Sequence, residues 1–162
     1  MDKVLNVAQF IIDEYKKITG TSIDELKLHK LLYFAQRESL AILGRPMFSE
    51  KFEGWKLGPV CKVVRYNFME GELNCSTEKV SDEAAYILKN VILTYGEKAS
   101  WKLSKMTHEE ISWKNSRKGL APDEKGNKEL SIEDIKKDAE KVRPYDHVWD
   151  MYYDEFEDAE VM

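Results

Sequence analysis

His108 and Glu109 are the neighbouring residues whose types could do chemistry, either as a general base or as metal ligands. The zinc-hydrolase pattern H-E-x-x-H needs a second histidine four residues after His108, and Ser112 occupies that position. The three histidines of the chain are widely separated in sequence. We therefore expect no catalytic residue, no metal site and no cofactor, and we predict that the protein is not an enzyme.

Two other patterns favour structural explanations. Gly58 and Pro59 lack the surrounding G-x-x-x-x-G-K sequence of a phosphate loop, and they are typical of a turn from an extended segment into a helix. Cys61 and Cys75 form no C-x-x-C pair, so neither a metal site nor a disulfide framework is indicated. We interpret them as buried or idle thiols.

A row of cationic residues around one aromatic side chain is a candidate binding surface. Its members recur at i, i+3, i+7 and i+10 of an expected helix and are Lys27, Lys30, Phe34 and Arg37. On one helix face they could contact an acidic protein or the phosphates of a nucleic acid. The alternative interpretation is a solvated helix flank that has no partner.

The composition indicates a soluble globular protein, because 43% of the 162 residues are hydrophobic and 34% are charged. No apolar run is long enough to cross a membrane or to act as a signal peptide, so a cytoplasmic location is expected. The net charge of −5 is uneven, because residues 145–162 hold seven acids and no Lys or Arg. Residues 1–144 are nearly neutral, which disfavours nucleic-acid binding, although binding through a local basic patch is still an alternative.

Apolar spacing predicts a mainly α fold, with helices opened by capping residues. The expected helices cover residues 4–18, 22–43, 59–70, 81–95, a short 101–106, 108–117 and 131–142. Capping boxes are expected at Ser22 with Glu25 and at Thr107 with Glu110. An extended or hairpin segment is expected near 47–57. The prediction is a single compact helical domain of about six to seven helices.

Three stretches of the chain together resemble one protein family. Residues 27–36, KLHKLLYFAQ, are similar to the signature K-L-x-K-L-L-Y-x-A-Q of the Panacea domain, the SocA-like and GepA-like antitoxins. Residues 52–60, FEGWKLGPV, resemble its F-x-A-W-x-x-G-P-V, and residues 103–117, LSKMTHEEISWKNSR, its L-S-x-L-T-H-x-E-x-P-W-x-x-A-R. The departures from the pattern are Gly54, Met106, Ser112 and Ser116.

The resemblance implies a mostly helical, non-catalytic antitoxin that neutralises a partner toxin by binding it. Relatives are paired with toxins of many unrelated kinds and also occur in phages and prophages, so the identity of the toxin is not predicted. The matched motif residues are expected to have structural roles, with Thr107 as a helix N-cap, His108 packing locally and the tryptophans filling volume. These residues are Tyr33, Gln36, Trp55, Gly58, Pro59, Thr107, His108, Trp113 and Arg117.

The C-terminal tail, residues 145–162, lies outside the family pattern. Its large apolar residues fall at i, i+3, i+4, i+7 and i+11, which predicts a helix with an aromatic face, and they are Tyr145, Val148, Trp149, Tyr152 and Phe156. Such a face could dock on the protein's own body, residues 1–144, or on a basic partner, with Trp149, Tyr152 and Phe156 as anchors. Both alternatives stay open at this point.

The leading hypothesis is an interaction protein that binds a cognate toxin through the tail or the basic row. One alternative is a DNA-binding autoregulator that uses the basic row. The other is a phage anti-defence protein whose acidic tail imitates nucleic acid. The sequence leaves homo-oligomerisation open.

Overall fold

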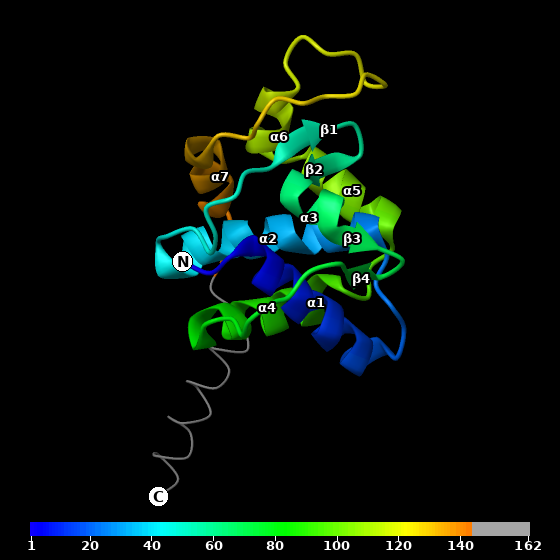
Figure 1. The fold of residues 1–162 in the computed structure, drawn as a ribbon. Coiled ribbons are helices and arrows are strands. Elements are labelled where there is room, and N and C mark those ends of the chain that lie inside the picture. The colour runs from blue at the N-terminus through cyan, green and yellow to red at the C-terminus, as the bar shows by residue number, and fades with distance from the viewer. Residues whose placement is uncertain (144–162) are drawn as a thin grey trace, which may run out of the picture.

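The computed structural model describes residues 1–143, and these residues form a mainly α domain built around one central helix. Helix α2, Glu25–Leu43, crosses the middle of the molecule, with α1, Val4–Thr19, and α4, Asp82–Tyr95, below it in Figure 1. Above it lie α5, Ser100–His108, α6, Ile111–Ser116, and α7, Ile132–Ala139. Helix α3, Lys62–Asn67, stands beside a hairpin. The predicted fold class is confirmed, with seven helices in the described range.

Two small antiparallel hairpins complete the fold. Strand β1, Glu53–Trp55, pairs with β2, Gly58–Val60, and β3, Phe68–Met69, pairs with β4, Glu72–Leu73. The expected extended segment is therefore confirmed, but it extends further than predicted. Pro59 lies in β2 and does not open a helix, because Gly54 and Pro59 are partners across the hairpin and α3 begins only at Lys62.

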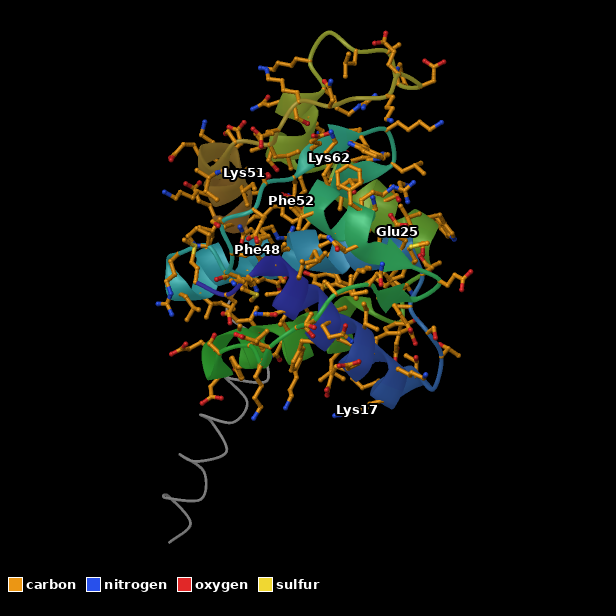
Figure 2. All side chains as sticks on the ribbon, viewed as in Figure 1. Lys17, Glu25, Phe48, Lys51, Phe52 and Lys62 are labelled. Atoms are coloured by element: carbon orange, nitrogen blue, oxygen red, sulfur yellow. The ribbon has the colours of Figure 1, made fainter. Side chains whose placement is uncertain are left out.

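The core lies between α2 and its neighbours. It contains apolar side chains that periodicity placed on the inner faces of α1, α2 and α4, such as Ile11, Leu28 and Leu88. Two aromatic side chains between α2 and β1, Phe48 and Phe52, are also buried, and Figure 2 shows them on the segment that leads to the hairpin. This arrangement covers α2 so completely that even its charged side chains from residue 27 to residue 38 are buried.

Helix caps are partly as predicted. Ser81 and Ser131 cap α4 and α7 through their hydroxyls, with amide-to-oxygen distances of 3.2 and 3.0 Å. The predicted capping box at Ser22 is wrong. The N-cap of α2 is Asp24, whose side chain accepts a hydrogen bond from the Lys27 amide, and the helix begins at the next residue, Glu25. Thr107 is likewise no N-cap, since it lies within α5 and its hydroxyl donates to the Ser104 carbonyl at 2.8 Å.

A carboxylate from a different helix takes over the cap of α6. Asp138 on α7 accepts from the amides of Ile111 and Ser112 at 2.7 and 3.0 Å. It also accepts from the Tyr33 hydroxyl of α2 at 2.9 Å. Because unsatisfied amides at a helix start need acceptors, one side chain thus fixes α2, α6 and α7 against each other.

Replacing Asp138 by Ala should lower the free energy of unfolding by about 2–4 kcal/mol, since buried donors from three groups lose their acceptor. Urea unfolding followed by circular dichroism measures this change. The matched control is Glu133→Ala on the same helix, whose side chain is 73% exposed, and its effect should stay within about 0.5 kcal/mol. Equal losses in the two variants would contradict the role given to Asp138.

Candidate functional site

The basic row on α2 lies inside the protein. Lys27, Lys30, Phe34 and Arg37 are all buried, and Lys30 and Phe34 have no exposed surface at all. This corrects both sequence interpretations of the row, because neither a solvated flank nor a surface for an acidic partner can be formed by these side chains. Apolar periodicity identified one inner face of α2, whereas in the fold other elements cover its opposite face as well.

Each cation of the row is held by an acceptor from a distant segment. Lys27 Nζ donates to the Gly96 carbonyl at 2.9 Å, and Lys30 Nζ donates to the Leu57 carbonyl. The Arg37 guanidinium is paired with the buried Glu110 carboxylate, and it lies over the Phe34 ring. A buried charge without such partners would be very costly, so the row fixes three other segments to α2.

The polar residues of the same signature have equally specific partners. The Tyr33 hydroxyl bonds Ser112 Oγ as well as Asp138, at 2.9 Å in each case. The Gln36 amide donates to the Phe48 carbonyl and accepts from the Met47 amide, both at 2.8 Å. The signature residues of α2 therefore form a scaffold, and their partners lie in the chain segments that follow α2.

The second and third motifs meet at the hairpin β1–β2. Trp113 Nε1 donates to the Trp55 carbonyl at 2.8 Å, and Arg117 donates to the Gly54 carbonyl at 2.9 Å. The His108 and Trp113 rings stack with their centroids 4.1 Å apart, as expected of a locally packing histidine. At Gly54 a Cβ would overlap the Ser116 hydroxyl in its present orientation, so Gly54 and Ser116, two of the family departures, pack directly against each other.

Gly58 and Lys30 form a tight contact behind the hairpin. Gly58 has a φ of 132°, and a Cβ there would overlap Lys30 Nζ and approach Thr107. Burial lowers the pKa of Lys30 from 10.5 to about 7. Burial, together with the nearby Lys30, also lowers the pKa of His108. Close packing therefore explains the presence of Gly58, Thr107 and His108 without a catalytic role for them.

A second ionisable group of α2 is buried without a matching cation of its own. Burial raises the pKa of Glu38 to about 7, although the Arg37 charge opposes this. Burial also raises the pKa of Glu110, again against the influence of Arg37. For Asp138 the hydrogen bonds from Ser112 and Ile111 outweigh burial, and its pKa is lowered. Asp138 is thus the carboxylate of this cluster that stays ionised as the pH falls.

An apolar-lined pocket of about 470 Å³ lies beside the hairpin, and we call it the Trp55 hollow. Its walls include Leu26, Trp55, Leu57 and Val60, with the His29 ring at the side of α2. His29 Nδ1 accepts from the Cys61 amide at 3.3 Å, so Nε2 carries the proton and lies 3.2 Å from Glu25. Burial lowers the pKa of His29, which favours this neutral form.

Charged side chains surround the Trp55 hollow. Arg65 binds both carboxylate oxygens of Glu25, at 2.6 and 2.8 Å, and Lys125 Nζ lies 4.9 Å from the centre of the Trp55 ring. An apolar floor with a few polar groups at its edge is suited to receiving a side chain or a small molecule. Within residues 1–143, no cluster of three or more metal-ligating side chains is found.

Cys61 is buried and Cys75 is exposed, and both are free thiols. Among the described helices, none is long and apolar enough to cross a membrane. Trp149, Tyr152 and Phe156 lie outside the described residues, as does the tail that contains them.

The comparison with known proteins agrees with these motifs. Residues 28–114, more than half of the chain, match the family model described as Antitoxin SocA-like, Panacea domain. The chain belongs to this family. The Panacea match includes most of α2, the hairpin β1–β2 and most of α6, which are the elements joined by the signature hydrogen bonds.

One curated relative of this Panacea protein is Antitoxin SocA of Caulobacter vibrioides (strain NA1000 / CB15N). The two are 43% identical over 58 residues, which cover 36% of this chain but 30% of the relative, so the match spans less than a third of that relative's length. No solved structure matches the chain significantly.

Sequence reasoning missed the two carboxylates that complete the buried network. Glu110 was placed in a capping box, and its pairing with Arg37 has no local signal because 73 residues separate them. Asp138 lies outside the matched family region, and its role depends on how α7 packs. The one available signal was the presence of an arginine and lysines on the helix that was expected to be central, because such cations need buried acceptors there.

Lys30 should give the protein a distinctive pH dependence. Its folded pKa of about 7 lies below its ordinary value of 10.5, so between these values the unfolded chain binds more protons. The free energy of unfolding should therefore rise by about 2 kcal/mol between pH 7 and pH 9. Urea unfolding at both pH values tests this, and the rise should be lost in Lys30→Met. Parallel pH curves for the two proteins would contradict the burial of an uncharged lysine.

Proposed function

We propose that this protein neutralises a partner toxin by binding it directly, without catalysing a reaction. Membership of the antitoxin SocA-like Panacea family carries this proposal. The geometry supports it, because the polar residues of the signature are occupied in internal hydrogen bonds and ion pairs. A rigid scaffold of this kind is suited to presenting a surface to another protein.

We place the toxin contact outside the basic row of α2. Those cations are buried and already bonded within the protein. The hypothesis of a DNA-binding autoregulator used the same row, so we do not propose it. The tail, residues 145–162, supplies anchors of the type that dominate protein interfaces, namely Trp149, Tyr152 and Phe156. Its seven acids would speed association with a basic toxin surface.

The test of the function is rescue from a toxin. The products of the genes next to this one are expressed in a bacterial host, and a product that arrests growth is then co-expressed with the full chain. Restored growth and co-purification of the two proteins are expected. If growth arrest persists although both proteins are expressed, the proposal is overturned.

The contact is tested by Trp149→Ala combined with Tyr152→Ala. Loss of two interface aromatics should weaken toxin binding by about 30-fold or more, measured by calorimetry with the purified toxin. The matched control is Trp101→Ala, since Trp101 is 70% exposed on the body and should not affect binding. If rescue works but the double variant binds like the unaltered protein, the function stands and the tail contact is wrong.

A further inference from the structure

Two segments at one end of the protein are rich in cationic side chains, three of which pair with Glu53, Glu25 and Glu109. Residues 54–66 and 114–128 together contain eight cationic residues and two acidic ones, Asp123 and Glu124. We call these two segments the positively charged lobe. Seven of its cations are exposed, namely Lys56, Lys62, Arg65, Lys114, Lys118, Lys125 and Lys128. The chain as a whole has a net charge of −5, so this lobe is a local reversal of sign.

The two segments form one structural body. The Gly54 amide donates to the Lys128 carbonyl at 2.9 Å, and Arg117 donates to the carbonyls of Gly54 and Glu124. In Figure 1 they occupy the upper part of the molecule, where the loop after α6 lies above β1 and β2. Lys62, labelled in Figure 2, lies close to this hairpin. Four of the exposed cations, Lys56, Lys62, Arg65 and Lys125, line two adjoining pockets of this body.

The Trp55 hollow opens in this lobe and gives it an apolar centre. Leu57 in its wall is 49% exposed, and the nearby Tyr66 is 73% exposed beside an adjoining pocket that shares Trp55, Arg65 and Lys125. Among the described residues, the ion pairs of the lobe leave Lys56, Lys118, Lys125 and Lys128 without a carboxylate partner. The surface thus offers an apolar pocket with lysines that have no carboxylate partner, although Asp123 also lies in the wall of the hollow.

These features fit an acidic peptide with an aromatic anchor better than a nucleic acid. A phosphate backbone has no apolar side chain to fill the hollow, and Arg65 and Lys62 next to it are already paired with Glu25 and Glu53. The apolar walls of the hollow would instead receive a large apolar side chain. Carboxylates on either side of that anchor would then meet the unpaired lysines.

The chain itself contains a segment with this chemistry. Residues 145–162 carry seven acids, no Lys or Arg, and aromatic residues at helical spacing. The segment can also reach the lobe. Trp149 and Tyr152 lie six and nine residues after Arg143, so at about 3.3 Å per extended residue they can lie roughly 20 and 30 Å from it. A domain of this size has a radius of gyration of about 15 Å, so Tyr152 can reach surfaces about two such radii away from Arg143.

We propose that residues 145–162 dock on the positively charged lobe of the same molecule, with Trp149 or Tyr152 inserted in the Trp55 hollow. This inference does not depend on toxin binding. If the tail also recognises a toxin, the toxin must compete with the lobe, and its capture of the tail uncovers the hollow. The lobe then holds the recognition segment in a closed state until a partner arrives.

Limited digestion of the full chain with chymotrypsin tests the docking, because this protease cuts after exposed aromatic residues. Cleavage at Trp149, Tyr152 and Phe156 should be slow in the unaltered protein. In Lys56→Glu combined with Lys125→Glu it should become about fivefold faster or more, since two attractive charges turn repulsive. The matched control, Lys89→Glu combined with Lys102→Glu, changes the same charge outside the lobe and should leave the rate unchanged.

Equal cleavage rates in the two double variants and the unaltered protein would overturn the proposal. Circular dichroism of each variant ensures that faster cleavage does not reflect unfolding. Protection that disappears on dilution would place the tail on a second copy, which also overturns docking within one molecule. The last measurement is the binding of a labelled DNA duplex to the unaltered protein and to the double variant. If Lys56→Glu with Lys125→Glu abolishes DNA binding without changing chymotrypsin cleavage of the tail, the lobe binds nucleic acid and the docking proposal is overturned.

Discussion

The burial of charged and polar side chains along α2 is the constraint on which the rest of the structure depends. A cation or hydroxyl taken out of water must find an acceptor, and α2 buries several within four turns. Lys27, Lys30 and Arg37 each find one on a different segment, at Gly96, Leu57 and Glu110. The spacing of the signature therefore determines which later segments pack on α2 and where. A helix with only apolar residues at these positions would not determine which later segments pack on it.

This constraint also explains why the residues of the family signature differ from the residues proposed to bind a partner. The signature residues are used internally, so they define a scaffold that different proteins of the family can share. Recognition must then use surfaces that the signature does not occupy. In this chain the tail lies outside the signature, whereas the positively charged lobe includes signature residues such as Trp55 and Gly58, and the two segments have charges of opposite sign.

Local signals in the sequence were reliable where local interactions decide the structure. The helical class, the caps at Ser81 and Ser131 and the hairpin near β1 followed from spacing and residue type. The predictions were wrong where a residue far away in the sequence determines the local structure. Thr107 has the sequence of a cap, yet Asp138 caps α6 from 27 residues away. The basic row was expected at the surface, because periodicity cannot show that other elements cover both sides of one helix.

The central claim is that a partner is recognised through the tail while the signature core stays internal. Hydrogen exchange of the full chain, measured by mass spectrometry with and without the purified toxin, tests this claim directly. Binding should slow exchange in residues 145–162 and leave exchange in α2 unchanged. Slower exchange confined to the body, with none in residues 145–162, would contradict the account and place recognition on the scaffold itself.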